Sequence, residues 1–202
     1  MAATAERIIL ASASAARAAL LRGAGVDFTA EPAAIDESRL KRKARRSGDS
    51  ALSCASALAC EKACVISRRH PHALVIGADQ ILAAGARWFD KPGDLAEACA
   101  QLRALRGRTH ALATAVCVAQ GGVPLWHAAS APEMRMRRFS DAFLEGYIAA
   151  EGEALLGSVG AYRIEGRGVQ LFSRIAGDHF AALGLPLIEL LAFLRVRGVM
   201  LR

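Results

Sequence analysis

The sequence predicts an α/β fold in which a curved mixed β-sheet is flanked by helices. First, short apolar runs with strand character alternate with longer segments whose apolar residues recur at helical spacing. Second, hydrophobic residues make up 53% of the 202 residues and charged residues 22%, as is typical of a packed globular protein. Third, we find no internal repeat, low-complexity tract or obvious linker. One domain over residues 1–202 is therefore expected.

The first half of the chain begins with a strand, a polar turn and a helix. The turn is Ser12-Ala13-Ser14, and a turn of this kind directs backbone N–H groups toward one point, where they can hold phosphate. Asp79 is expected at the C-terminal end of a later buried strand, where α/β proteins commonly carry site residues. The expected elements are strands at 7–11, 26–30 and 73–77, helices at 15–24 and 50–67, and a loop at 32–38.

The residue pattern of the second half of the chain predicts a hairpin, two long paired strands and further helices. The long strands are expected to meet across the Gly121-Gly122 turn, and Ser140 is expected to cap the helix that follows them. The expected elements are a strand at 87–89, a turn at 90–93, a helix at 94–105, strands at 109–119 and 125–137, strand and loop at 157–171, and a last helix opened by Leu185-Pro186.

Composition favours a cytoplasmic protein without a membrane segment. The apolar run 8–10 is too short for a signal peptide, and Glu189, Arg195 and Arg197 interrupt the apolar stretch at 185–201. The five cysteines are odd in number and include no CxxC pair, which predicts free thiols in a reducing compartment.

The net charge of +7 raises the question of a nucleic-acid partner, since residues 41–46 form a basic block. However, only 5% of residues are aromatic, and no helix-turn-helix or zinc-finger pattern accompanies the charge. We therefore interpret the block as a solvated face and do not expect nucleic-acid binding. A basic surface would equally attract small polyphosphates.

Asp79 is the strongest single candidate for chemistry. It directly follows the apolar run 74–78, so it is expected to be partly buried and to need a metal, a cation or a hydrogen-bond donor as partner. A structural salt bridge is the alternative. Taken singly, Arg17, Lys62, Lys91 and Glu37 read as ordinary surface or turn residues.

Together, these residues resemble the Maf family of nucleotide pyrophosphatases in order and spacing from Leu10 to Leu194. The resemblance implies an elongated, ITPase-like fold with two lobes and a cleft, and it is compatible with a homodimer. The matching segments are Leu10-Ala11-Ser12-Ala13-Ser14 with Arg17, Asp36-Glu37, Glu61-Lys62-Ala63, Gly77-Ala78-Asp79-Gln80, Lys91-Pro92, Gly107 with His110, Gly160-Ala161-Tyr162, Glu165-Gly166 and Gly184-Leu185-Pro186-Leu187.

The resemblance also implies hydrolysis of a nucleoside triphosphate to a monophosphate and diphosphate. Asp79 would act as general base on the attacking water, or would share Mg²⁺ or Mn²⁺ with Glu37. The phosphate oxygens would be bound by Arg17, Lys62 and Lys91, with the N–H groups and hydroxyls around Ser12 and Ser14.

Three positions bear on the nucleobase. Gln80 and Glu165 resemble the branch of the family that acts on 7-methyl-GTP, whereas the dTTP/UTP branch usually has Thr and Gln there. 7-Methylguanine carries a positive charge, and a carboxylate about 4 Å away would attract it by roughly 4 kcal/mol before desolvation. Glu165 could instead pair with Arg163 or Arg167.

Ala16 departs from both branches, which typically have Trp and Arg respectively at this position, so a stacking surface and a phosphate contact are both missing. Two alternatives therefore stay open beside a 7-methyl-GTP pyrophosphatase. One is a dTTP/UTP pyrophosphatase. The other is a catalytically weak regulator of cell division and septum formation on the same fold.

Overall fold

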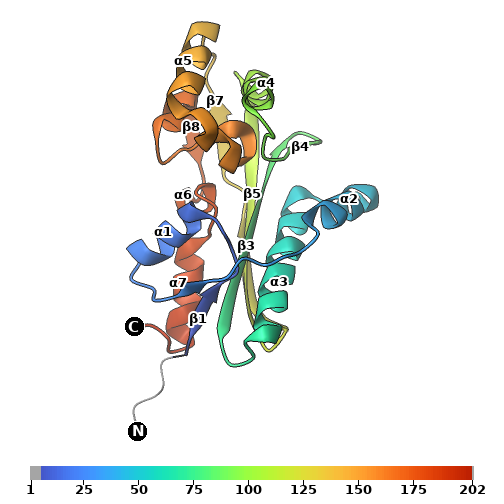
Figure 1. Cartoon of the computed structure of the whole chain (residues 1–202), viewed down its shortest axis with the longest axis vertical. Coiled ribbons are helices and arrows are strands. Elements are labelled where there is room, and N and C mark those ends of the chain that lie inside the picture. The colour runs from blue at the N-terminus through green and yellow to red at the C-terminus, as the bar shows by residue number, and fades with distance from the viewer. Residues whose placement is uncertain (1–5, 202) are drawn as a thin grey trace.

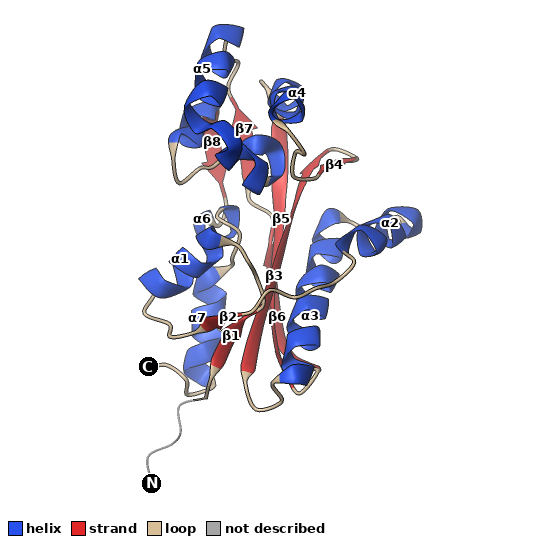
Figure 2. Ribbon diagram, in the orientation of Figure 1, coloured by secondary structure: helices blue, strands red, loops and turns tan. Residues whose placement is uncertain are grey.

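Two long antiparallel strands, β3 (Leu74–Ala84) and β5 (Thr109–Gln120), run through the computed structural model, which describes residues 6–201 (Figure 1). Within these residues the strands form one mixed sheet in the order β2-β1-β3-β5-β7-β8, with β4 also on β3 and β6 also on β5. Helices lie on both sides of the sheet (Figure 2). The predicted α/β fold with a mixed, helix-flanked sheet is confirmed.

One lobe is built around the first half of β3. There β1 pairs in parallel with β2 and β3, and β6 pairs with β5. The helix α3 covers one face of the sheet, and α1 and α7 cover the other (Figure 1). The bounds are β1 (Ile8–Leu10), α1 (Ala15–Gly23), β2 (Thr29–Ala30), α3 (Ala51–Arg69), β6 (Val123–Ser130) and α7 (Leu187–Val196).

Alternating side chains explain why helices cover both faces of this lobe. Ile9 and Val75 pack with α3, whereas Leu10 and Ile76 pack with α1 and α7. All four side chains are fully buried. A strand that is buried on both faces must be apolar at every position, which is why the short apolar runs predicted these strands correctly.

The second lobe is built around the other ends of β3 and β5. A separate core fills it, with Leu82, Leu102, Leu112 and Met134 at its centre. Its elements are β4 (Arg87–Phe89), α4 (Leu95–Leu105), β7 (Glu133–Met136), α5 (Asp141–Glu151), β8 (Phe172–Ala176), α6 (His179–Ala182) and 3₁₀ turns at Gly152–Gly157, Val159–Ala161 and Arg167–Leu171.

The strand that carries Asp79 is longer than predicted. Asp79 was expected to follow a strand ending at residue 77, but it lies within β3. On one edge β1 pairs only with residues 74–76, whereas on the other edge β5 pairs with residues 75–83. Pairing with β5 therefore keeps the backbone extended beyond Asp79.

Three further segments differ from the prediction. The expected strand at 125–137 is split into β6 and β7, because Pro132 lies between them and has no N–H to donate to a ladder. The expected loop at 32–38 ends in α2 (Glu37–Ser47), which Asp36 caps. Residues 157–171 form 3₁₀ turns rather than a strand, and positive φ angles at Gly160 and Ala161 are incompatible with extended backbone.

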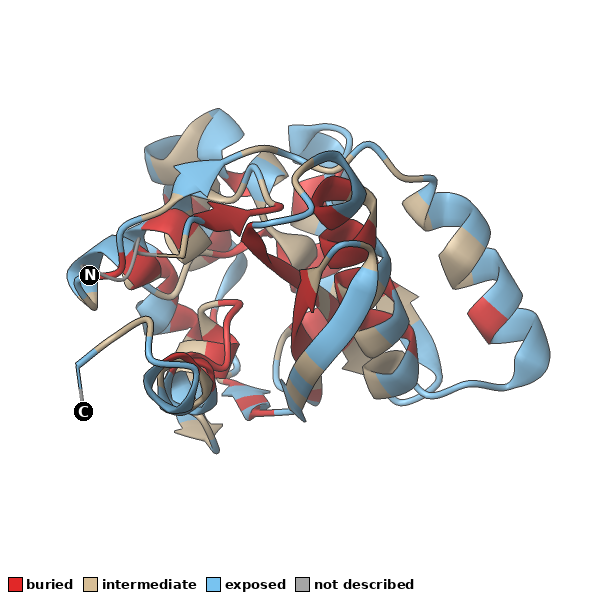
Figure 3. Ribbon diagram, turned by 90° about the horizontal axis from the view of Figure 1, so that it is seen from below, coloured by how far each residue is buried: buried red, intermediate tan, exposed pale blue. Residues whose placement is uncertain are grey.

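The sheet and the helix faces packed on it are buried, whereas α2 is mostly exposed. Figure 3 shows buried residues concentrated on the strands and on the helix faces that touch them. In α2 Ala44 is buried, and most other residues are exposed. Among residues 6–201, no helix has both the length and the apolar character needed to cross a membrane.

Candidate active site

The candidate site lies at a gap in one edge of β3. On this edge β1 pairs with residues 74–76 and β4 with residues 82–84, so within the described chain residues 77–81 have no strand partner there. Asp79 and Gln80 occupy the gap, and as neighbours in a strand they point to opposite faces. A crevice where adjacent strands diverge is a common ligand site in α/β proteins.

The close packing of α3 on β3 positions the first charged pair. At Gly77 a Cβ atom would overlap the carbonyl oxygen of Ala59 and the backbone nitrogen of Ala63, so only glycine permits this approach. The approach brings Lys62 to Asp79, and Lys62 Nζ donates to Asp79 Oδ1 at 2.6 Å. Gly77 is thus part of the architecture of the site.

Lys62 is shared by two carboxylates. Its Nζ also lies 2.7 Å from Glu37 Oε1, at the start of α2. The side chains of Lys62 and Asp79 are only 10% and 7% exposed, so each charge depends on the other for compensation. Burial alone would raise the pKa of Glu37, but the hydrogen bond from Lys62 and the charges of Lys41 and Lys91 lower it overall. Two carboxylates therefore lie within hydrogen-bond distance of one ammonium group.

The turn before α1 holds an arginine against the same pocket. Arg17 Nε donates to Gly184 O at 2.8 Å, and Nη1 donates to Ser12 Oγ at 3.1 Å. Ser14 caps α1 by accepting from the backbone N–H of Arg17. Burial lowers the pKa of Arg17, although nearby carboxylates oppose the shift. Among the described residues Nη2 has no hydrogen-bond partner, which leaves it for a ligand.

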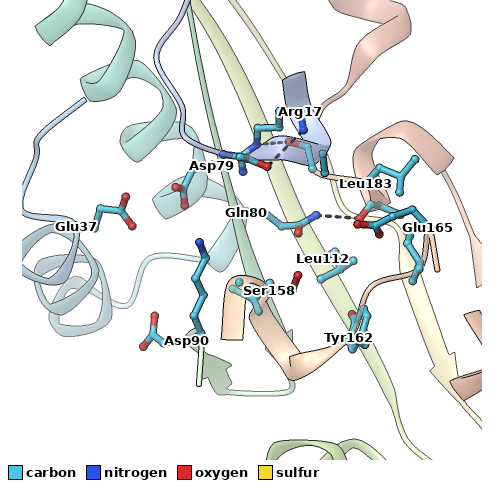
Figure 4. A pocket seen from close by; sticks show the side chains of 18 of the residues that line it. Arg17, Glu37, Asp79, Gln80, Asp90, Leu112, Ser158, Tyr162, Glu165 and Leu183 are labelled. Atoms are coloured by element: carbon cyan, nitrogen blue, oxygen red, sulfur yellow. Dashed lines mark hydrogen bonds between the residues drawn. The ribbon is translucent and has the colours of Figure 1, made fainter. Parts of the chain in front are cut away.

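These groups line one end of a pocket of about 400 Å³. In Figure 4, Glu37 and Asp79 lie on one side of it and Gln80, Leu112 and Tyr162 lie toward the other. The charged end therefore lies in the first lobe and beside β3, while the second end opens between β5 and the 3₁₀ turns.

Gln80 is fixed by hydrogen bonds at the second end of the pocket. Its Nε2 donates to Thr114 Oγ1 at 2.9 Å and to the carbonyl oxygen of Ala181 at 3.0 Å. Because two acceptors hold the amide nitrogen, the amide oxygen is the group that Gln80 offers to the pocket.

Glu165 brings a carboxylate to this end. Arg163 Nε lies 3.4 Å from Glu165 Oε1, and the two side chains are 41% and 39% exposed, so the pair is long and well solvated. The pairing with Arg163 considered from the sequence is therefore present but weak. Glu165 remains available to a ligand in the pocket.

A buried aromatic pair supports the same wall. The hydroxyl of Tyr162 lies 2.7 Å from Nε2 of His110, and both residues are buried. Burial lowers the pKa of His110 to about 4, so the imidazole is neutral at pH 7. Tyr162 thus forms part of a fixed, uncharged wall, and Ala16 lines the pocket without contributing an aromatic surface.

The charged end fits a hard divalent cation bound together with phosphate. Carboxylates of Glu37 and Asp79 reach the same Lys62 nitrogen, so their oxygens lie close enough to face one ligand. Mg²⁺ and Mn²⁺ are commonly held by one or two carboxylates together with waters and substrate phosphates. No cluster of three or more acidic, histidine or cysteine side chains forms a protein-only metal cage among residues 6–201.

The structure brings the sequence-predicted residues together. Ser14, Ala16, Arg17, Glu37, Lys62, Asp79, Gln80, Lys91 and Glu165 line the pocket, and Ser12 lines an adjoining hollow. Sequence reasoning did not select Lys41, Asp90, Leu112, Ser158 or Leu183, which line it as well.

A model of the Maf-like protein family matches residues 7–197. The chain belongs to the Maf family. It is 54% identical over 189 residues to a nucleoside triphosphate pyrophosphatase of Granulibacter bethesdensis, an overlap that covers 94% of this chain and 96% of that protein. It is 50% identical over 201 residues to a protein of the same name from Rhodospirillum rubrum, with full coverage of both chains.

One relative carries a more specific name. A 7-methyl-GTP pyrophosphatase of Rhizobium meliloti is 46% identical over 191 residues, which span 95% of this chain and 96% of that protein. Similarity therefore extends over nearly the whole chain, including both ends of the pocket.

Proposed function

We propose that this member of the Maf family, a nucleoside triphosphate pyrophosphatase, prefers 7-methyl-GTP and converts it to 7-methyl-GMP and diphosphate. The observation that carries the proposal is the division of the pocket. A cluster of Glu37, Lys62 and Asp79 occupies one end, and the carboxylate of Glu165 with the amide oxygen of Gln80 occupies the other. A nucleotide has the matching polarity, with phosphates at one end and a base at the other.

At the phosphate end, water attacks the α-phosphorus while the bond to the bridging α–β oxygen breaks. Lys62 holds one oxygen of Asp79, so the other is free to accept the proton of that water. The proton remains on Asp79 until solvent removes it, and the bond electrons leave with diphosphate. Negative charge develops on that leaving group, and Arg17 and Lys91 lie in the pocket to bind it.

A divalent cation belongs to the same proposal. Glu37 and Asp79 would hold Mg²⁺ or Mn²⁺, which when bound supplies positive charge to the phosphate oxygens. Asp79 would then contribute to the metal site in addition to, or in place of, its role as base.

At the base end, Glu165 favours a purine that carries positive charge. Guanine presents N–H donors on its Watson–Crick edge, and both the Glu165 carboxylate and the Gln80 amide oxygen accept hydrogen bonds. Thymine and uracil carry no positive charge, so they lose the attraction to Glu165. The weak contact with Arg163 reduces this preference without removing it.

The test is a substrate panel. Purified protein is incubated with Mg²⁺ or Mn²⁺ and with 7-methyl-GTP, GTP, dTTP, UTP or CTP, and monophosphate and diphosphate are quantified separately. We expect equimolar products and the highest kcat/KM for 7-methyl-GTP. A preference for dTTP or UTP would overturn the assignment of the base. Absence of diphosphate from every nucleotide would favour the regulatory alternative.

A further inference from the structure

Lys41 differs from the other cations of the basic block at 41–46. Its side chain is only 17% exposed, whereas the neighbouring Arg42 and Lys43 are exposed. Lys41 Nζ donates to Asp90 Oδ1 at 2.6 Å, and both residues line the pocket. This lysine is therefore directed inward from α2, unlike the solvated face expected from the sequence.

The surroundings of Lys41 place it at the phosphate end. Burial alone would lower its pKa, but Asp90 and the charges of Asp79 and Glu37 raise it overall, so the amine stays protonated at neutral pH. Lys91, which directly follows Asp90, lines the same pocket. Lys41 and Lys91 thus line the same pocket as the Glu37–Lys62–Asp79 cluster.

The negative charge of a bound triphosphate requires a further cation at this end of the pocket. A nucleoside triphosphate carries several negative charges on its phosphates, while Lys62 is already neutralised by two carboxylates. Among residues 6–201, Lys41 has one ion-pair partner, Asp90, whose side chain is 57% exposed. An exposed carboxylate holds its cation loosely, because water competes for both charges.

Asp90 also has a second cation within reach. Arg45 Nη2 lies 3.9 Å from Asp90 Oδ2, and the Arg45 guanidinium lies 5.2 Å from the centre of the Trp88 ring. If Lys41 turns toward a phosphate, Arg45 can keep Asp90 compensated. The Asp90 carboxylate can therefore position Lys41 without trapping it.

We infer that Lys41 is a further substrate-binding residue, which contacts the β- and γ-phosphates that leave as diphosphate, and that Asp90 positions its ammonium group. This inference rests on the proposed function. The competing interpretation is that the Lys41–Asp90 pair only fastens α2 to the turn after β4. The two interpretations differ in what happens when diphosphate binds.

The experiment compares Lys41→Met, Asp90→Asn and the control Lys43→Met, which removes an exposed lysine from the same helix. Binding of inorganic diphosphate in the presence of Mg²⁺ is measured by calorimetry, and inhibition by diphosphate and by nucleoside monophosphate is measured with the preferred nucleotide. Circular dichroism and thermal melting check that each variant folds.

We expect Lys41→Met to weaken diphosphate binding about tenfold, as the loss of one charge-assisted hydrogen bond predicts, and to leave inhibition by monophosphate unchanged. Asp90→Asn should have a smaller effect, and Lys43→Met should have none. Unchanged diphosphate binding in folded Lys41→Met, or equal losses in Lys41→Met and Asp90→Asn, would overturn the inference. Calorimetry needs no turnover, so an inactive wild-type protein would refute the proposed function separately.

Discussion

The two ends of the pocket are built from different kinds of structure. At the phosphate end, Asp79 comes from the middle of β3 and Lys62 from the middle of α3, and both are buried. At the base end, Tyr162, Ile164 and Glu165 come from the segment between two 3₁₀ turns, and Glu165 is exposed to solvent. The chemistry is thus carried by packed regular elements, and the selection of the base is carried mainly by a connecting segment.

This difference has a physical consequence. A side chain on a packed strand or helix is held by the core around it, so a small change there disturbs both fold and chemistry. An exposed side chain such as that of Glu165 tolerates substitution better, because fewer buried contacts depend on it. We therefore expect changes at the phosphate end to affect turnover of every nucleotide, and changes at the base end to affect the choice among nucleotides.

The largest effect is expected at Asp79. Asp79→Asn keeps the shape and a hydrogen-bond acceptor for Lys62 but removes the proton acceptor, so kcat should fall by about 10³-fold for every nucleotide in the panel. Steady-state kinetics across the panel measure this loss. The exposed Asp27→Asn serves as a matched control and should keep full activity.

Metal dependence separates the two roles of Asp79. If Asp79 acts as the base, raising Mn²⁺ will not restore the activity of Asp79→Asn. Recovery at high Mn²⁺ would assign it to the metal site instead. Loss confined to one nucleotide would contradict the division of the pocket, since a residue of the phosphate end should not select among bases.

The next effect is expected at Glu165. Glu165→Gln removes the charge but keeps the size, and it should lower kcat/KM for 7-methyl-GTP relative to GTP by about tenfold, which corresponds to about 1.4 kcal/mol. This is less than the unscreened attraction, because the side chain is 39% exposed and has Arg163 beside it. The ratio of kcat/KM values for the two nucleotides is the measurement.

Arg163 supplies the complementary test at the base end. Arg163→Gln removes the competing cation, so it should shift the ratio in the opposite direction from Glu165→Gln. If both variants shift the ratio in the same direction, or if neither shifts it, Glu165 does not act through its charge.

The kind of structure that carries each residue of the pocket also determines whether the sequence could predict it. At the phosphate end, Asp79 could be predicted from the apolar run before it, whereas the other residues were predicted because their order and spacing resemble the Maf family. The helix α2 was not predicted, because Leu40 and Ala44 are the only apolar residues among its eleven and the rest of the segment is polar or charged. Lys41 was therefore interpreted as a surface cation.

Contacts between segments that are distant in the chain could not be predicted from the sequence either. Lys41 and Asp90 are 49 positions apart, and Arg17 is 167 positions from the glycine whose carbonyl oxygen it binds. The extended conformation of β3 beyond residue 77 depends on its pairing with β5. No local pattern reports such pairing, so Asp79 was placed at the end of its strand instead of within it.

A smaller effect is expected at Ala16. Ala16→Trp would add an aromatic surface to the pocket, and stacking on a base should lower KM for purine nucleotides by several-fold, in line with about 0.5–1.5 kcal/mol for an aromatic contact. The measurement is KM for 7-methyl-GTP, GTP and UTP. Ala16→Leu adds bulk without a π system and serves as control. An equal change in both variants would show that pocket volume, not stacking, is responsible.

The smallest effect is expected in the pH dependence of stability. The pKa of Glu37 is lower in the folded protein than its ordinary value, so its ionised form contributes stability above pH 4.5. That contribution is lost as the pH falls through the folded pKa. Because the side chain is 43% exposed, the loss should be well under 1 kcal/mol. Urea unfolding between pH 6 and pH 3 should show a shallower acid decline for Glu37→Gln than for the wild type. Parallel curves would mean that Lys62 is compensated by Asp79 alone, and that Glu37 is free to serve the substrate.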